Sequence, residues 1–302
     1  MAATLLGIDW GTSNRRAYLV GREGVLAHHA DEQGLLAVQG GGNGAASTSF
    51  ADSLSALRVR MGIGSEVPVV MSGMVGSASG WQEVPYLHTD VSLERLPEHL
   101  AALSGQPGCS IVPGYRSDRP HIDVMRGEET QLLGAVAMGV RAGWVVLPGT
   151  HSKWVHLEDG CIGQFSTFMT GELFATLGKT GTLASMLGTG DDLSPSFEAG
   201  LAEARAGQPL SHSLFGVRAR VVTHALPSSE ARAFVSGLLI GSEFAQAERM
   251  GGAADPGVIH LVGSAALSQR YVRAAAFFGV AAKALDPDQA YLNAMQQFLE
   301  KV

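Results

Sequence analysis

The organisation of the chain is decided by the stretch LLGIDWGTSNRR, residues Leu5–Arg16. Its apolar first half predicts a buried strand, Thr4–Ile8, that ends at Asp9. The next two strands are predicted over Arg15–Val20 and Val25–Ala30, with only a short glycine-containing turn between them. Three strands joined by turns form a β-meander, so the chain does not open with a strand–helix–strand unit.

A second run of strands repeats this pattern about 140 residues further along the chain. It comprises the predicted strands Trp144–Leu147, Lys153–Leu157 and Cys161–Thr167, again joined by short turns. Each meander is followed by segments with strand and helix patterns. We therefore expect an α/β protein of two duplicated lobes with a cleft between them. The N-terminal lobe is expected over residues 1–140 and the C-terminal lobe over residues 141–302.

The remaining elements are predicted from the spacing of apolar residues. The predicted helices are Phe50–Met61, Glu128–Met138, Gly171–Leu177, Phe197–Ala206, Ser229–Met250, Ser264–Phe278 and Pro287–Leu299. The further predicted strands are Val67–Met71, Cys109–Val112 and Val258–Val262. Loops are expected over Gly40–Gly44 and Pro113–Arg126, and a glycine-rich stretch, Gly73–Gly80, follows the strand Val67–Met71.

The composition describes a chain with a large apolar core and a lightly charged surface. Hydrophobic residues make up 46% and charged residues 16%, which excludes an intrinsically disordered protein. Lysine and arginine total 21 against 28 aspartate and glutamate, so the formal net charge is −7. This acidic balance argues against nucleic acid as a partner, because binding to phosphate backbones needs a basic surface.

Cysteine usage and apolar run lengths indicate the compartment. The two cysteines, Cys109 and Cys161, fit a reducing compartment better than a disulfide framework. Charged residues follow the first apolar residues at once, so no secretory signal peptide is expected. The longest apolar stretches fall far short of the roughly 20 residues that a membrane span needs. We expect a cytoplasmic protein with no membrane partner. Whether it forms a homodimer is left open.

The turn after the first strand has the residue types of a phosphate site. Asp9 ends the strand, and it is followed by glycine and small polar residues, namely Gly11, Thr12, Ser13 and Asn14. Backbone amides and hydroxyl groups in such a turn can hold phosphate oxygens, and the aspartate can hold Mg²⁺. Arg15 or Arg16 could add positive charge. The alternative is an ordinary β-turn with an Asx cap.

The second meander carries a similar turn, and a third segment follows later. Gly149, Thr150 and His151 lie between two predicted strands, where they could hold phosphate oxygens from the other side. Gly263 and Ser264 join a strand to a helix, with Ser264 as a candidate N-cap, and this junction suits an adenosine pocket. The alternatives are a hairpin turn and a plain strand–helix junction.

A fourth segment brings an arginine and two carboxylates to the start of a helix. Arg126, Glu128 and Glu129 lie where the predicted loop meets the helix Glu128–Met138. One glutamate could act as a general base toward a substrate hydroxyl, and Arg126 could pair with a substrate carboxylate. Adjacent helical residues point about 100° apart, so only one glutamate should face the site, and we expect Glu128. The alternative is that both glutamates only stabilise the first helical turn.

Several blocks of this sequence resemble the 2-dehydro-3-deoxygalactonokinase family. The segment from Asp9 to Arg16 is similar to the first phosphate motif of the sugar kinase, actin and heat-shock ATPase superfamily. The blocks that resemble the kinase family are PVVMSGMVGSASGW (Pro68–Trp81), VMRGEETQLLGA (Val124–Ala135), LPGTHSKWV (Leu147–Val155), TFMTGEL (Thr167–Leu173) and FVSGLLIGSE (Phe234–Glu243).

The resemblance implies two ribonuclease H-like lobes that close on ATP and Mg²⁺. It implies transfer of the γ-phosphoryl group to the 6-hydroxyl of 2-dehydro-3-deoxy-D-galactonate in galactonate breakdown. Asp9 would organise Mg²⁺, and the turns already named would hold phosphates and adenosine. Trp81 and Glu172 would join Arg126 in contacting the sugar acid. A carboxylate opens the matching helix in relatives, often as aspartate, which leaves the choice between Glu128 and Glu129 open.

Two other functions remain open at this point. A kinase of the same superfamily that acts on another sugar or keto-deoxy acid would share most of these motifs. A neutral sugar, however, would not need Arg126 at the substrate end. A non-kinase actin-like ATPase is the second alternative. A chaperone of this superfamily would need a peptide-binding domain, for which about 300 residues leave no room.

Overall fold

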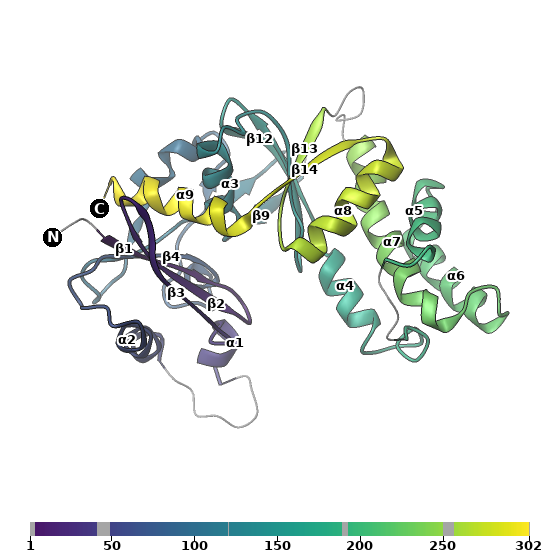
Figure 1. The fold of residues 1–302 in the computed structure, drawn as a ribbon, viewed down its shortest axis with the longest axis horizontal. Helices are drawn as coiled ribbons and strands as arrows, with labels where there is room; N and C mark the ends of the chain where they lie inside the picture. The colour runs from purple at the N-terminus through teal and green to yellow at the C-terminus, as the bar shows by residue number, and fades with distance from the viewer. Residues whose placement is uncertain (1–3, 41–48, 120, 189–192, 250–256, 302) are drawn as a thin grey trace. The chain divides into compact units, whose positions relative to one another are not determined.

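A computed structural model of the chain describes residues 4–40, 49–119, 121–188, 193–249 and 257–301 (Figure 1). It divides into two compact units. The first unit comprises residues 1–142, 157–165 and 287–302, and the second comprises residues 143–156 and 166–286. The units are therefore not contiguous in sequence: the C-terminal segment 287–302 belongs to the first unit, although the expected C-terminal lobe included it. The expected loop over Gly40–Gly44 lies, beyond Gly40, outside the described residues.

The first unit is built on a six-stranded sheet with the order β3-β2-β1-β4-β7-β6. β1 and β2 pair antiparallel, as do β2 and β3, which confirms the opening meander. β4 then pairs parallel with β1, and β7 pairs parallel with β4. The strands are β1 (Thr4–Trp10), β2 (Arg15–Gly21), β3 (Gly24–Asp31), β4 (Val69–Gly73), β6 (Ala101–Ala102) and β7 (Cys109–Ile111).

A five-stranded sheet repeats this order as β12-β11-β10-β13-β14. Here β13 pairs parallel with β10, and β14 pairs parallel with β13. The strands are β10 (Gly143–Leu147), β11 (Ser152–Glu158), β12 (Cys161–Phe168), β13 (Val258–Val262) and β14 (Ala281–Leu285). In both sheets the first strand of a meander therefore lies beside a later parallel strand, so the expected repeat is present in the strand order.

Helices complete each unit. In the first unit they are α1 (Leu35–Val38), α2 (Phe50–Met61), α3 (Glu128–Ala137), α9 (Pro287–Leu299) and the 3₁₀ helices η1 (Met74–Gly76) and η2 (Leu93–His99). In the second unit they are α4 (Thr170–Leu177), α5 (Ser196–Arg205), α6 (Leu210–Val222), α7 (Ser228–Ala247) and α8 (Ala265–Phe278). None of the helices that the structure describes is both long and apolar enough to span a membrane.

The prediction of a long polar loop over the whole of Pro113–Arg126 was wrong. That stretch contains β8 (Tyr115–Ser117) and β9 (Asp123–Met125), which pair antiparallel and form a small sheet with β5 (Leu87–His88). Strands of two or three residues are too short to show a period. Helix α6 and strand β14 also went unpredicted. α6 buries only two of its residues, and β14 is alanine-rich and mostly exposed, so neither has a marked apolar pattern.

Helix α9 lies alongside α3 in the first unit (Figure 1). The two helices approach so closely at Gly134 that a methyl group there would overlap the backbone carbonyl of Ala290. α9 also reaches β1: a side chain at Gly7 would collide with Met295, which is fully buried. The last helix is thus fixed against the strand that carries Asp9.

Gly134→Ala should destabilise the protein by about 1–3 kcal/mol, because the added methyl group has no space between α3 and α9. Gly216→Ala in α6 is the matched control, since an added Cβ there would lie 3.6 Å from the Arg220 side chain, at ordinary contact distance. The control should gain up to about 1 kcal/mol from helix propensity. Urea unfolding followed by circular dichroism measures both. Equal stability of the two variants would contradict the close packing at Gly134.

Candidate active site

The candidate site of the first unit forms where β1 and β4 end side by side. In the parallel pair, Asp9 is level with Ser72 and Trp10 with Gly73. Gly73 has φ 88°, and a Cβ there would lie 2.8 Å from the Trp10 carbonyl oxygen. Gly127, with φ 108°, directly precedes α3, and a Cβ there would lie 3.3 Å from the Gly73 Cα. These two glycines allow the start of α3 to reach the ends of both strands.

Asp9 is paired with an arginine from the neighbouring strand. Arg16 Nη2 lies 2.7 Å from Asp9 Oδ2, and Arg16 Nη1 lies 3.4 Å from Asp288 Oδ1. The Tyr18 hydroxyl donates to the same Asp288 oxygen at 2.8 Å. Burial raises the pKa of Asp9, the Arg16 guanidinium lowers it, and the nearby Glu128 carboxylate raises it further. The structure therefore brings Asp9 and Glu128 into one electrostatic environment.

Only one of the two adjacent arginines reaches Asp9. Arg15 is buried and forms a bidentate pair with Asp31, with N–O distances of 3.1 and 2.7 Å. Its guanidinium also donates to Ser53 and lies 5.0 Å from the centre of the Trp10 ring. Arg15 is thus part of the core. Of the two arginines, Arg16 is the one that places positive charge beside Asp9. Neighbouring residues of a strand face opposite sides of the sheet.

The turn between β1 and β2 is supported by α1. The amide of Gly11 donates to the Asn14 carbonyl at 2.9 Å, which closes the turn. The first two amides of α1 donate to the carbonyls of Gly11 and Thr12 at 2.9 and 3.0 Å. The side chains of Thr12, Ser13 and Asn14 are exposed. Small polar side chains on a supported turn can meet a phosphate group without reorganisation of the backbone.

The two glutamates at the start of α3 occupy different environments. Glu129 is fully buried, and its Oε2 accepts from the Gly127 amide at 2.6 Å. Its Oε1 has no hydrogen-bond partner among the residues that the structure describes. Burial, assisted by the charge of Glu128, raises the pKa of Glu129 to about 8. Glu128 is partly exposed, and its Oε2 accepts from the Arg126 amide at 3.2 Å.

Arg126 presents a cation that protein groups satisfy only in part. Its guanidinium lies 4.3 Å from the centre of the Tyr86 ring, and Nη2 donates to the Val84 carbonyl at 2.7 Å. Nε and Nη1 are buried and have no hydrogen-bond partner within the described part of the chain. Buried polar atoms are nearly always hydrogen-bonded in folded proteins. An anionic ligand such as a carboxylate could accept from one of these nitrogens together with the second N–H of Nη2.

Trp81 lies in an aromatic cluster beside this site. Its ring stacks on Phe50 with centroids 5.8 Å apart and meets Trp10 edge-on at 6.5 Å. The side chain is only partly buried. Trp81 thus contributes to the core next to the end of β1, and the part that is exposed is what a substrate could contact.

In the second unit, the two predicted nucleotide segments lie together at the ends of parallel strands. β10 and β13 pair with Val146 level with Leu261. A Cβ at Gly263 would lie 3.2 Å from Pro148 Cδ, so the Gly263–Ser264 junction adjoins the turn that begins at Gly149. Ser264 is the N-cap of α8, as expected, and its hydroxyl accepts from the Leu267 amide at 3.4 Å.

The start of α4 contacts the same turn. The Glu172 amide donates to the Thr150 carbonyl at 3.0 Å, and the Glu172 carboxylate lies 2.5 Å from His151 Nε2. Both side chains are nearly half exposed, at 46% for His151 and 45% for Glu172. The structure therefore brings together the four predicted residues Gly149, Thr150, His151 and Glu172.

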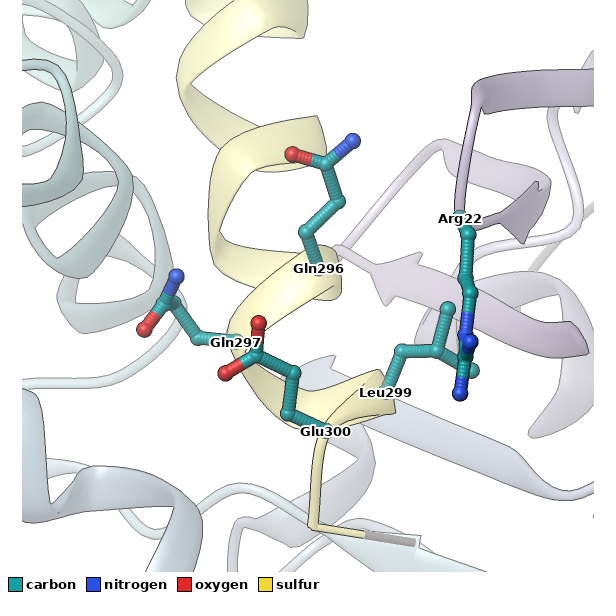
Figure 2. A pocket seen from close by; sticks show the side chains of 5 residues that line it. All are labelled: Arg22, Gln296, Gln297, Leu299 and Glu300. Carbon is teal, nitrogen blue, oxygen red and sulfur yellow. The ribbon is translucent and has the colours of Figure 1, made fainter. Parts of the chain in front are cut away.

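The candidate site residues form no cluster of metal ligands within the described ranges, and they do not line the cavity shown in Figure 2. The described ranges contain no group of three or more His, Cys, Asp or Glu side chains that could hold a metal ion. A cavity of about 530 Å³ in the first unit is lined by other residues, which are Arg22, Gln296, Gln297, Leu299 and Glu300 (Figure 2).

A family model described as 2-keto-3-deoxy-galactonokinase matches residues 9–298. The chain belongs to this family. The match includes both turns, the start of α3 and the Gly263–Ser264 junction, and it confirms the resemblance that the sequence blocks indicate.

Two relatives can be aligned with nearly the whole length of this chain. A probable 2-dehydro-3-deoxygalactonokinase of Rhizobium meliloti (strain 1021) is 38% identical over 291 residues, 94% of this chain and 92% of the relative. A 2-dehydro-3-deoxygalactonokinase of Escherichia coli (strain K12) is 34% identical over 293 residues, 96% of each chain.

Solved structures show the same fold. A Sinorhizobium meliloti protein, provisionally named a 2-dehydro-3-deoxygalactonokinase, has a TM-score of 0.87 at 36% identity and covers 96% of both chains. Component A of the (R)-2-hydroxyglutaryl-CoA dehydratase of Acidaminococcus fermentans has a TM-score of 0.55 at 14% identity and covers 99% of both chains. At that identity the second likeness concerns the fold alone.

Several residues of the candidate site were not predicted from the sequence. Tyr86 supports Arg126, and Asp288 pairs with Arg16 from 272 positions along the chain. Tyr86 lies in a stretch without a periodic pattern, and Asp288 resembles any acidic residue in the first turn of a helix. Only the fold shows that these residues approach the site.

Glu129→Gln should change how stability depends on pH. The pKa of Glu129 in the folded protein, about 8, lies above the usual value for glutamate, so the folded state keeps a proton that the unfolded state releases. As pH rises between the usual glutamate value and about 8, the wild type should lose stability relative to the variant. The slope should approach about 1.4 kcal/mol per pH unit and level off above pH 8. Urea unfolding of both proteins at several pH values measures this. Parallel profiles would contradict it.

Proposed function

We propose that the protein is an ATP-dependent 2-dehydro-3-deoxygalactonokinase. It would transfer the γ-phosphoryl group of ATP to the 6-hydroxyl of 2-dehydro-3-deoxy-D-galactonate, a step of galactonate breakdown. Family membership and the names of the two relatives support this activity. Cytoplasmic localisation and a homodimer remain predictions from the sequence.

The observation that carries the choice of substrate is the state of Arg126. Two of its guanidinium nitrogens are buried without a hydrogen-bond partner in the described ranges, while the third is bound to a backbone carbonyl. The Tyr86 ring holds the guanidinium plane from one side. A planar fork of N–H groups fits a carboxylate, and a 2-keto-3-deoxy acid carries one at C1. A neutral sugar would offer this guanidinium no negative charge.

We further propose that the chain forms a pair of ribonuclease H-like lobes that bind ATP, and the strand order of the two sheets supports this pair. Both sheets place a meander beside later parallel strands in the same order. In both, the predicted ligand segments lie at the carboxyl ends of parallel strands, where α/β proteins commonly bind ligands. We assign the first phosphate turn and the sugar-acid site to residues 1–140, and the second phosphate turn and adenosine junction to residues 141–302.

The residues fit ATP and Mg²⁺ in this arrangement. Mg²⁺ in phosphoryl-transfer sites is commonly held by one or two carboxylates together with substrate phosphates, so the single carboxylate of Asp9 suffices. The turn residues Gly11, Thr12, Ser13 and Asn14 would contact phosphates, as would Gly149, Thr150 and His151. Gly263 and Ser264 would border the adenosine. The bound metal would neutralise phosphate charge, and Arg16 would share that role from its position beside Asp9.

Glu128 is the better candidate for the base of the two adjacent glutamates. It is partly exposed and lies near Asp9, whereas Glu129 is enclosed and bonded to the Gly127 amide. Glu128 would take the proton from the 6-hydroxyl as its oxygen attacks the phosphorus. Glu129 would keep the start of α3 in place. Trp81 and Glu172 would contact the sugar acid, and lobe closure would exclude water that could otherwise hydrolyse ATP.

Substrate identity is tested by ADP release with 2-keto-3-deoxy acids and with neutral sugars. The wild type should turn over the acids only. Arg126→Ala should raise the KM of the keto acid at least about tenfold and leave the KM of ATP nearly unchanged, because one buried charged pair is lost. Arg126→Lys is the matched control: it keeps the charge without the fork and should recover part of the affinity. Faster turnover of a neutral sugar would overturn the assignment.

The choice of base is tested by two neighbouring substitutions. Glu128→Gln should lower kcat by roughly 10²–10⁴-fold with little change in either KM, because proton transfer occurs only in the chemical step. Glu129→Gln should keep most of the activity. If Glu129→Gln is the inactive variant and Glu128→Gln is active, the roles are reversed. Full activity in both would show that the start of α3 is structural.

A further inference from the structure

A fully buried carboxyl group lies behind the second phosphate turn. Glu243 of α7 has no exposed surface. Its Oε2 accepts from Trp154 Nε1 at 2.7 Å, and its Oε1 accepts from the Tyr271 hydroxyl at 2.7 Å. The Tyr271 hydroxyl is also 2.8 Å from Ser152 Oγ. None of these residues belongs to the site proposed above.

The partners of Glu243 come from segments that flank the turn. The hydroxyl groups of Thr170 and Ser152 also favour the charged form of this carboxyl group and so lower its pKa. Ser152 directly follows His151 and opens β11, while Thr170 opens α4 two residues before Glu172. One carboxyl group of α7 thus connects the segment that leaves the turn with the helix that contacts it.

The start of α4 and the turn are in direct contact. A Cβ at Gly171 would overlap the Gly149 carbonyl oxygen and lie 2.9 Å from Thr150 Cα. The Glu172 amide also donates to the Thr150 carbonyl at 3.0 Å. Any shift of α4 or of the first residue of β11 would therefore move the turn itself.

A buried carboxyl group contributes little to the free energy of unfolding. Burial raises the pKa of Glu243, and the hydrogen bonds from neutral donors offset only part of that unfavourable effect. Apolar side chains of similar volume often give equal or greater stability than such buried charged groups. A satisfied polar network does, however, hold its members in one arrangement.

We propose that Glu243 is a positioning residue for nucleotide binding, which holds the Gly149–His151 turn in shape through Ser152, Tyr271 and Thr170. The proposal rests on the proposed function only in taking this turn as a nucleotide phosphate site. A turn that is already ordered loses little conformational freedom when the phosphate binds. Loosening the network should therefore weaken nucleotide affinity without removing any group that contacts the nucleotide.

The test measures the Kd of ADP with Mg²⁺ by titration calorimetry, together with the Tm of each variant. Glu243→Gln and Tyr271→Phe should each raise Kd by about 5- to 30-fold, as the loss of one or two buried hydrogen bonds would. Gly149→Val changes the turn itself and should also weaken binding. The space around an added Cβ at Gly149 is empty of protein atoms within the described structure, so this variant should fold.

Glu203→Gln is the matched control for a general loss of stability. Glu203 of α5 accepts from Arg220 at 2.6 Å and from Ser213 at 3.1 Å, in the same unit. This variant should lower Tm while leaving the Kd of ADP unchanged. In steady-state assays, the network variants should raise the KM of ATP more than the KM of the keto acid. A purely structural role would lower the active fraction without changing either KM.

The outcomes separate this proposal from the proposed function. An unchanged Kd in folded Glu243→Gln and Tyr271→Phe proteins would overturn the positioning role, and Tyr271→Phe decides alone if Glu243→Gln does not fold. A wild-type Kd in Gly149→Val would overturn it as well, because the turn would then not contact the nucleotide. A wild type that binds ADP but phosphorylates no keto-deoxy acid would overturn the proposed substrate, while the expected pattern of Kd values would still support the role of Glu243.

Discussion

The first unit depends on the parallel pairing of β1 with β4 and on the close backbone approach at its end. Asp9 lies on a strand that enters the site, whereas Glu128 and Arg126 lie more than 100 residues later. Asp9 and Glu128 share one electrostatic environment because Gly73 and Gly127 let the start of α3 reach the strand ends without side-chain collisions. Larger residues at these positions would separate the carboxylates. The chemistry proposed for this unit therefore requires the glycines as much as the charged groups.

The second unit has a similar strand order, but different contacts hold its turn in place. Its parallel pair, β10 and β13, brings the turn at Gly149 beside Gly263. In the first unit, backbone amides of α1 bind the carbonyls of the turn. In the second, a helix start contacts the turn and the buried carboxyl group of Glu243 connects the flanking segments. The repeat thus preserves where the proposed ligand-binding segments lie, while each unit stabilises its own turn.

Adjacent residues of the same type show why side-chain roles were hard to assign from sequence. Arg15 and Arg16 are chemically alike, yet Arg15 is part of the core and Arg16 pairs with Asp9. Glu128 and Glu129 likewise diverge, because only Glu129 is enclosed. The alternation of a strand and the rotation of a helix separate neighbours onto different faces. Which face meets the core depends on partners far away in the chain.

The sequence by itself determined the α/β class, the two meanders, the family and the segments that form both candidate turns. These features follow from local patterns of apolar residues, glycines and small polar groups, which act over a few residues. The tertiary structure alone decided that residues 287–302 join the first unit and that Glu243 lies behind the second turn. It also decided that two buried nitrogens of Arg126, beside the Tyr86 ring, have no hydrogen-bond partner among the described residues. Each of these depends on packing between distant segments, and the burial and hydrogen-bond partners that such packing creates have no local pattern in the sequence.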